Sequence, residues 1–286
     1  MASVAVVTDS TADIPLGTRT ELGISMVPLK VLFGSESYLD NITLQPAEFY
    51  ERLPKFGGLP TTSQPSPADY LEVFERLLAE GKSIVSIHLS GAMSGTYQSA
   101  TIARSMLDDD ADVTVIDSKS ASFGYGQLVV TAAEMARDGA SKEAIVAEVR
   151  RLRDELKLYF VVGTLEYLQK GGRIGKASAV LGSLLNIKPI LSIDKEGVVY
   201  PFDKARGQKR AFARIVEVLA SDVGGRPVNL TVATTPGHTE GAAELTDMLK
   251  RALDVREFKE TDIGPVIGAH AGPGTIGLFV FPLRSD

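Results

Sequence analysis

The sequence predicts an α/β protein in two parts, a parallel-sheet half followed by a mixed-sheet half. Short apolar runs alternate with stretches of helical spacing through most of the 286 residues. The apolar runs of the first half are nearly continuous, which is typical of parallel strands that are buried on both faces. In the second half several strands follow one another directly, which favours a mixed sheet with helices on one side.

The first half is expected to alternate strands and helices. An extended run over 24–33 is expected to form one strand. A helix over 67–81 is expected to begin at Pro67 and to end at Gly81, because proline favours the first helical turn and glycine the position after the last. The other expected strands are 3–7, 83–89 and 111–117, and the other expected helices are 94–107, 120–138 and 141–156.

The second half is expected to contain more adjacent strands. A turn at 195–197 joins two paired strands, 188–194 and 198–202. The remaining elements are expected to be a strand over 158–164, a helix over 165–170, a Gly-rich turn over 171–175, an apolar helix after it, helices over 207–221 and 239–252, and strands over 228–234, 255–261 and 276–281. The change of pattern predicts two domains, residues 1–157 and residues 158–286.

The composition restricts the classes of function. The chain has no cysteine, which excludes disulfides, thiolate metal sites and catalytic thiols. Its first residues lack the basic region and the long apolar run of a signal peptide, and no later run could span a membrane, so we expect a cytoplasmic protein without an integral membrane segment. A net charge of −6 argues against nucleic acid as a partner.

One stretch departs from the acidic balance of the chain. From residue 170 to residue 210, nine Lys and Arg residues stand against three Asp and Glu residues. A chance fluctuation along a solvated surface explains such an excess as readily as a docking patch for an acidic partner or a phosphate.

Three expected strands of the first half end in small polar residues, at 8–11, 90–96 and 117–120. In open parallel sheets, ligands bind beyond the carboxyl ends of the strands, where helix N-termini with free N–H groups can hold an anion. Ser94 begins an expected helix and has Tyr97, not Glu or Gln, at the position that would complete a capping box. The alternative is that these residues are ordinary helix caps.

Two further segments are candidates for a binding site. The irregular stretch 55–66 is long for a compact domain and offers hydroxyl groups at 61–63, although a surface turn would explain it as well. His270 lies in a charge-poor, Gly- and Pro-rich stretch, 264–274, whose close turns should leave the imidazole partly desolvated. Of the other histidines, His88 is expected in the core and His238 in a surface turn.

A metal or nucleotide cofactor is not expected. The sequence has no paired metal ligands at helical spacing, and its carboxylates have no histidine neighbours. The Gly-rich stretch 171–176 lacks the spacing of a Walker loop, and no GxGxxG follows a strand.

Five motifs together resemble the DegV family: TDST at 8–11, TTSQPS at 61–66, SGTYQSA at 94–100, LQKGGRIG at 168–175 and GAHAGPG at 268–274. That family includes the fatty-acid-binding subunits of bacterial fatty acid kinase. The resemblance implies an N-terminal three-layer α/β/α domain with a parallel sheet and a smaller C-terminal α/β domain with a mixed sheet. One departure from the family pattern is Met93, where leucine is usual.

The resemblance also implies roles for individual residues. Thr62 and Ser94 are expected to hold the carboxylate of a fatty acid, with His270 as a third contact. Arg173 and Arg206 match positions near the head group and the kinase-docking surface. The residues expected to support the carboxylate site are Ser63, Gly95, Thr96, Asp9, Ser10 and Ser118.

The predicted function is therefore binding of one long-chain fatty acid, such as palmitate, and presentation of its carboxylate to a separate kinase subunit, without catalysis by this chain. Burial of about fifteen methylenes at roughly 0.8 kcal/mol each supplies on the order of 12 kcal/mol before ordering costs. One alternative is a serine hydrolase with Ser94 as nucleophile and His270 as base, although Ser94 is not in a G-x-S-x-G elbow. Another is a dihydroxyacetone-kinase-like subunit with His270 holding the substrate.

Overall fold

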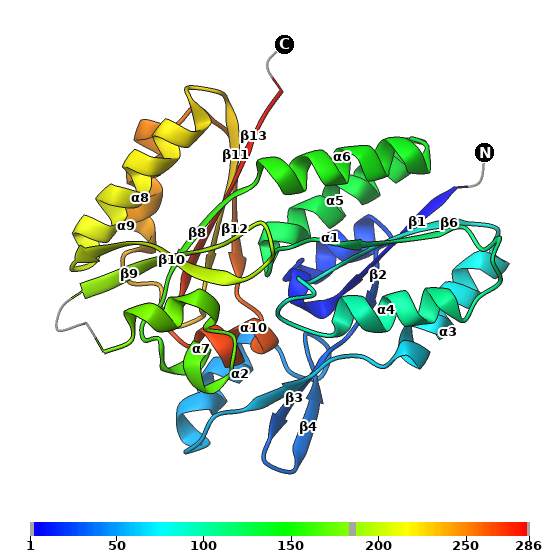
Figure 1. Cartoon of the computed structure of the whole chain (residues 1–286), viewed down its shortest axis with the longest axis horizontal. Helices are drawn as coiled ribbons and strands as arrows, with labels where there is room; N and C mark the ends of the chain where they lie inside the picture. Colours follow the sequence, from blue (N-terminus) through cyan, green and yellow to red (C-terminus); the bar gives the residue numbers. More distant parts are fainter. Residues whose placement is uncertain (1–2, 183–186, 285–286) are drawn as a thin grey trace. The chain divides into compact units, whose positions relative to one another are not determined.

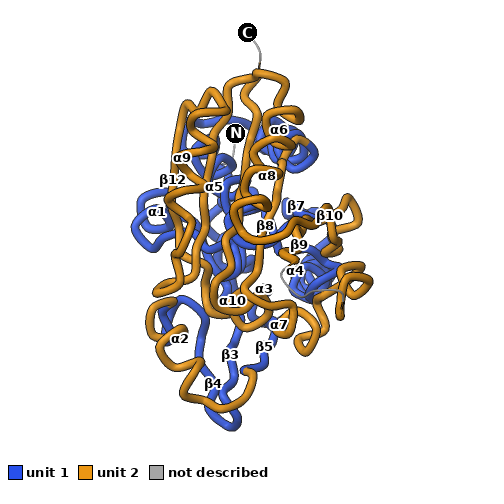
Figure 2. The backbone as a smooth tube through the Cα atoms, turned by 90° about the vertical axis from the view of Figure 1, so that its left-hand side faces the viewer, with its two compact units in different colours: residues 1–45, 60–154 blue, residues 46–59, 155–286 orange. Residues whose placement is uncertain are grey.

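The computed structural model describes residues 3–182 and 187–284 (Figure 1). The chain forms two compact units, one of residues 1–45 and 60–154 and the other of residues 46–59 and 155–286 (Figure 2). The segment 46–59 brings the second unit to about the length of the first. A single boundary near residue 157 does not anticipate this segment, and the division into two domains at that residue stays a prediction.

The first unit is built on a four-stranded parallel sheet with the order β2-β1-β6-β7. Its strands are β1 (Val4–Asp9), β2 (Ser25–Val27), β6 (Ser83–His88) and β7 (Val113–Asp117). Every residue of β6 is buried, and so are five of the six residues of β1. The sequence prediction of a parallel sheet with two covered faces is confirmed.

Helices form the outer layers of the first unit, α3 and α4 on one side of the sheet and α5 and α6 on the other (Figure 1). Tyr70 and Phe74 of α3 pack against Val7 of β1 in one core cluster. The α3 helix begins at Pro67, as predicted, and a capping box of Ser66 and Asp69 precedes it. The helices of this unit are α1 (Leu16–Glu21), α3 (Pro67–Ala79), α4 (Thr96–Ser105), α5 (Phe123–Arg137) and α6 (Lys142–Glu155).

A small antiparallel sheet completes the first unit, with the order β4-β3-β5. Its strands are β3 (Lys30–Phe33), β4 (Glu36–Leu39) and β5 (Thr61–Ser63). The prediction of one strand over 24–33 is wrong, because the chain leaves the parallel sheet after Val27 and enters the small sheet at Lys30. Pro28 lies at the break, and a proline cannot donate a ladder hydrogen bond. The segment 55–66 is not wholly irregular, since it contains β5.

The second unit has a six-stranded sheet with the order β10-β9-β8-β13-β11-β12. Its strands are β8 (Lys157–Val161), β9 (Ile187–Ile193), β10 (Val199–Arg206), β11 (Val228–Thr234), β12 (Val255–Asp262) and β13 (Ile276–Pro282). Only β11 and β12 pair in parallel, which confirms the predicted mixed sheet. The expected hairpin of β9 and β10 is present, with Gly197 in the turn at φ 83°.

The main core of the second unit lies between this sheet and two helices, α8 (Gln208–Val223) and α9 (Ala242–Ala252). Phe212 and Leu245 pack there against Leu278 of β13. The unit also contains the helices α2 (Pro46–Arg52), α7 (Glu166–Lys170) and α10 (Pro265–Ala271). Two 3-10 helices complete it, a short one at Leu53–Lys55 and a longer one at Gly175–Val180. An apolar helix was expected after residue 175. The structure has the 3-10 helix Gly175–Val180 there, and residues 183–186 lie outside the described residues.

The stretch around His270 differs from its prediction as a run of close turns. It forms the helix α10, with Pro265 at its first position and Gly272 just beyond its end at φ 78°. Proline at the start and glycine after the end are the ordinary boundaries of a helix, and they outweigh the high glycine content between them. In the part of the chain that the structure describes, no helix has both the length and the apolar character needed to cross a membrane.

Candidate functional site

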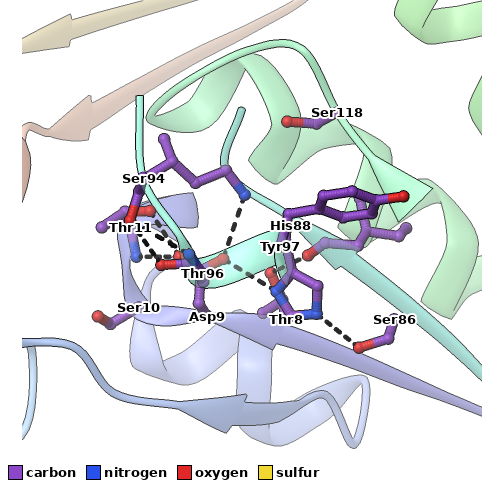
Figure 3. Close-up of polar contacts among 12 residues, drawn as sticks. Thr8, Asp9, Ser10, Thr11, Ser86, His88, Ser94, Thr96, Tyr97 and Ser118 are labelled. Atoms are coloured by element: carbon purple, nitrogen blue, oxygen red, sulfur yellow. Dashed lines mark hydrogen bonds and ion pairs between the residues drawn. The ribbon is translucent and has the colours of Figure 1, made fainter. Parts of the chain in front are cut away.

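The three polar segments of the first unit follow β1, β6 and β7, and therefore share the carboxyl end of the parallel sheet (Figure 3). Backbone hydrogen bonds join two of them, because the Ser90 N–H donates to the Ser120 carbonyl and the Ser118 N–H to the His88 carbonyl. The segments that follow β6 and β7 therefore lie side by side. The three segments divide into a closed inner network and a more open outer turn.

Asp9 is the centre of the inner network and is completely buried. Its Oδ1 accepts hydrogen bonds from the Thr11 hydroxyl at 2.5 Å and the Tyr125 hydroxyl at 2.7 Å, and its Oδ2 accepts from the Leu89 N–H at 3.2 Å. Burial raises the pKa of Asp9, but the hydrogen bond and charge of His88 and the hydroxyl donors lower it by more. The pKa is therefore below its ordinary value, and the carboxyl is held ionised. Donors of the protein itself therefore surround this carboxylate.

His88 connects Asp9 to Ser86 (Figure 3). Its Nδ1 lies 3.1 Å from Asp9 Oδ2, and its Nε2 lies 2.6 Å from the Ser86 hydroxyl. All three side chains are fully buried, which confirms the prediction of a core histidine. The order Ser–His–Asp has the polarity of a hydrolase triad, but a nucleophile needs contact with its substrate, and Ser86 lies in the middle of a buried strand.

Ser10 and Ser118 use their hydroxyls within the local chain. The Ser10 hydroxyl accepts from the Leu29 N–H at 3.0 Å, and the Ser118 hydroxyl accepts from the Ser120 N–H at 3.2 Å. Both serines are buried. These bonds fix the turns after β1 and β7, and a direct role of Asp9, Ser10 or Ser118 in ligand binding stays a prediction.

Ser94 belongs to the outer turn and is partly exposed. Its N–H donates to the Ser90 carbonyl at 3.2 Å, and its hydroxyl lies 2.9 Å from the Thr96 hydroxyl and accepts from the Thr96 N–H at 3.3 Å (Figure 3). The helix α4 begins at Thr96, two residues later than predicted, with Gly95 as a cap that has no side chain to bond the helix. Two hydroxyl groups thus lie at the start of this helix.

Gln64 brings the strand of Thr62 to the same helix. Its amide donates to the Ser99 hydroxyl at 3.4 Å, and a Cβ atom on Gly95 would overlap that amide. Thr62 is two residues from Gln64 in β5, where it pairs with Val31, and Ser63 is exposed at the end of the strand. The first unit therefore brings the segments of Thr62 and Ser94 into contact.

His270 lies in the second unit, in the last turn of α10 and partly buried. Burial, assisted by the positive charge of Arg173, lowers its pKa from 6.5 to about 4, so the imidazole is neutral at pH 7. A neutral imidazole can donate one hydrogen bond to a carboxylate. Since Thr62 and Ser94 belong to the first unit, the meeting of all three side chains at one carboxylate stays a prediction.

The basic stretch 170–210 is partly neutralised by its own surroundings. Lys170 pairs with Glu166, and Lys176 pairs with Asp194, both at 2.5 Å. Arg173 and Arg206 are exposed, the first after α7 and the second at the end of β10. Their proposed role in docking a partner is untested.

The second unit also contains a pocket of about 540 Å³. Apolar side chains make up much of its wall, among them Val162, Leu165 and Leu181, while Gln169 and Lys188 add polar groups. Its volume lies within the range of small-molecule sites, roughly 300–1,000 Å³. Among the described residues, no group of three or more His, Asp or Glu side chains is arranged to hold a metal ion.

Comparison with known proteins agrees with the five sequence motifs. A family model described as "Uncharacterised protein, DegV family" matches residues 3–283. The chain belongs to the DegV family. It is 40% identical to Protein DegV of Bacillus subtilis (strain 168) over 278 residues, 96% of this chain and 98% of that protein. It is 38% identical to a DegV domain-containing protein of Deinococcus radiodurans over 289 residues, 99% of this chain and all of that protein.

Solved DegV structures share the whole fold. The structure titled "Fatty Acid Binding of a DegV family Protein from Thermus thermophilus" is 39% identical, with a TM-score of 0.92 over 98% of this chain and all of that one. DegV of Bacillus subtilis, described as a fatty acid binding protein, is 38% identical with a TM-score of 0.88 over 99% of this chain and all of that one. A stearic-acid-binding protein from Eubacterium ventriosum is 28% identical, with a TM-score of 0.87 over 99% and 98% of the two chains.

Two residues that sequence reasoning did not select take part in the geometry around the predicted ligands. Gln64 contacts the start of α4, and Gly171 lies against His270. Gln64 falls inside a motif that resembles the family, but nothing in the sequence shows which way its side chain points. Gly171 looks like one more turn glycine, and only the packing of its neighbours distinguishes it.

Proposed function

We propose that this chain binds one long-chain fatty acid and holds its carboxylate on Thr62 and Ser94, with His270 as a third donor. The class of ligand comes from the relatives, since the titles of several solved DegV structures describe fatty acid binding. The site comes from this chain. The contact of Gln64 with Gly95, which brings the Thr62 strand to the Ser94 turn, is the observation that carries the proposal.

The chemistry of these residues suits a carboxylate. A buried charge without hydrogen bonds is strongly penalised, and hydroxyl groups at a helix start can donate without adding a second charge. Asp9, the only carboxylate within the five motifs, already accepts bonds from several protein donors and would not compete for the same hydroxyls. The supporting roles of Ser63, Gly95 and Thr96 belong to this proposal.

The hydrocarbon chain requires an apolar surface. The pocket of the second unit, with Val162, Leu165 and Leu181 in its wall, is an apolar surface of this kind within that unit. Fifteen or so methylenes can supply on the order of 12 kcal/mol before ordering costs, so a tight complex needs no cofactor.

We further propose that the chain acts without catalysis of its own, in the cytoplasm, and presents the carboxylate to a separate kinase that forms an acyl phosphate. A non-catalytic role is supported by the bonds of Ser94, whose hydroxyl lies beside the Thr96 hydroxyl rather than a base. The exposed Arg173 and Arg206 support docking of an acidic partner near the head group.

The test is direct analysis of the bound lipid. The purified protein is extracted and the extract is analysed by mass spectrometry, and delipidated protein is titrated with palmitate. We expect C14–C18 acyl species in the extract and uptake of palmitate at one site. If no acyl species is recovered and palmitate does not bind, the proposal is wrong.

Ser94→Ala tests the carboxylate site itself. Loss of a hydrogen bond to a charged group costs about 1–3 kcal/mol, so palmitate affinity should fall roughly 5- to 150-fold. Ser105→Ala, at the exposed end of the same helix, is the matched control and should bind as the wild type does. Unchanged affinity in Ser94→Ala would remove this serine from the site.

A further inference from the structure

The C-terminal ends of α7 and α10 interlock through two glycines and two rings, all within the second unit. A Cβ atom on Gly171, which follows α7, would overlap Nδ1 of His270 from α10. A Cβ atom on Gly272, which follows α10, would overlap the ring of Tyr167 from α7. Each helix therefore places a ring on the glycine that ends the other.

The backbone does not explain both glycines. Gly272 has φ 78°, a left-handed conformation that favours glycine in any case. Gly171 has φ −73° and ψ −9°, which any residue can adopt. A side chain at this position would collide with two groups. Its Cβ atom would overlap the imidazole of His270 and would lie 2.8 Å from the Tyr167 carbonyl oxygen.

The same peptide group binds Arg173. The Nη1 of Arg173 donates to the Gly171 carbonyl at 2.6 Å, and its charge contributes to the lowered pKa of His270. Gly171 thus has the imidazole on one side and the guanidinium on its carbonyl. Arg173 itself is exposed, whereas His270 is partly buried.

We propose that Gly171 and Arg173 position His270 for the carboxylate, and that the charge of Arg173 is coupled to the protonation of the imidazole. The inference rests on the proposed function. The charge of Arg173 disfavours protonation of the ring, and Gly171 leaves the space that the neutral imidazole occupies. A neutral imidazole in this position can donate one hydrogen bond to the carboxylate.

Palmitate titrations of three variants test the positioning. Gly171→Ala should displace the imidazole and weaken palmitate about tenfold, close to the effect of His270→Ala, as expected for one lost hydrogen bond to a charged group. Gly172→Asn is the matched control. Gly172 has φ 72° and no atom within 4 Å of its Cβ position, and asparagine tolerates that backbone, so affinity should stay within about twofold.

A histidine titration by NMR tests the role of Arg173, which a purely structural contact would not affect. The chain has three histidines, so the signals can be assigned by substitution. Arg173→Gln removes the cation and should raise the titration midpoint of His270, whereas Arg173→Lys keeps the charge and should return the midpoint toward the wild type. The signal of His238, in another turn, is the internal control.

The outcomes separate this inference from the proposed function. If His270→Ala binds palmitate as the wild type does, the third contact of the proposed function is wrong. If His270→Ala weakens binding but Gly171→Ala does not, the positioning role is wrong and the proposed function stands. If Gly171→Ala fails to fold, Arg173→Gln, a change of an exposed side chain, still decides, because an unchanged midpoint for His270 would overturn the coupling.

Discussion

Two histidines of this chain, His88 and His270, have opposite electrostatic surroundings. His88 lies between the carboxylate of Asp9 and the hydroxyl of Ser86, and all three side chains are fully buried. His270 is partly buried beside the guanidinium of Arg173, and its pKa is lowered to about 4. One ring lies next to an anion and the other next to a cation.

This difference separates a structural histidine from one suited to bind an anion. The protein provides the counter-charge of His88, and each nitrogen of its ring has a polar neighbour within the core. The protein places a positive charge beside His270, so the neutral ring lies in a positive potential that an incoming carboxylate would complement. A histidine near a cation at the end of a short helix is thus the better candidate for ligand contact.

The largest expected effect comes from Asp9→Asn. Removal of one partner from a buried charge pair destabilises a protein by about 3–5 kcal/mol, because the remaining groups stay buried without compensation. The change also replaces a carboxylate, which accepts hydrogen bonds at both oxygens, with an amide that can accept only at its one oxygen. We expect the free energy of unfolding in urea to fall by about this amount.

A control substitution shows whether that loss is specific to the pair. Asp138→Asn lies at the end of α5 and is exposed, so its effect on unfolding should stay within about 0.5 kcal/mol. A loss below 1 kcal/mol in Asp9→Asn would mean that this carboxylate is not the centre of the network.

The second prediction concerns the pH dependence of folding. The pKa of His270 is about 4 in the folded state and 6.5 when unperturbed, so the unfolded chain binds a proton that the folded chain resists. This histidine therefore contributes stability above pH 6.5, which is lost as the pH falls toward 4. The loss is on the order of 3 kcal/mol by the linkage of pKa to stability.

Unfolding free energies at pH 7.5 and pH 4.5, for the wild type and for His270→Gln, measure this contribution. The wild type should lose more stability than the variant over that interval. His238→Gln is the matched control and should follow the wild type. An equal loss in the wild type and in His270→Gln would show that this imidazole titrates normally in the folded protein.

The sequence predicted the strands that are buried on both faces and missed the short polar ones. The strands β1 and β6 are rich in Val and Ile and are buried almost throughout, so their apolar runs identify them. In contrast, β5 has three residues, Thr61–Ser63, without apolar alternation, and it is a strand because β3 offers it an edge. The helix α10 was missed because six Gly and Pro residues in 264–274 suggested turns, although two of them, Pro265 and Gly272, mark its boundaries.

The candidate site was predictable as a set of motifs and not as a geometry. Ser94 could be selected because it precedes a helix and follows a strand of a parallel sheet. The contact of Gln64 with Gly95 depends on how the small sheet packs, which no local pattern encodes. The role of Gly171 could not be predicted from its neighbours in sequence either, because it depends on contact with the imidazole of His270.

The smallest change in stability is expected at Gly95, where binding should respond instead. The backbone of Gly95, at φ −73°, admits alanine, and the atoms in the way are the amide of Gln64, the flexible end of a side chain. Gly95→Ala should therefore unfold within about 1 kcal/mol of the wild type. Displacement of Gln64 releases its bond to Ser99 and moves the strand of Thr62, so palmitate should bind about tenfold more weakly.

Gly17→Ala is the matched control for this change, because it also adds a methyl group within a helix of the first unit and meets no atom within 4 Å. Its palmitate affinity should equal that of the wild type, and its stability should rise by up to about 1 kcal/mol through helix propensity. The comparison then has one decisive result. If Gly95→Ala binds palmitate as tightly as Gly17→Ala does, the contact between Gln64 and α4 does not position Thr62, and the carboxylate site depends on Ser94 and its helix without that strand.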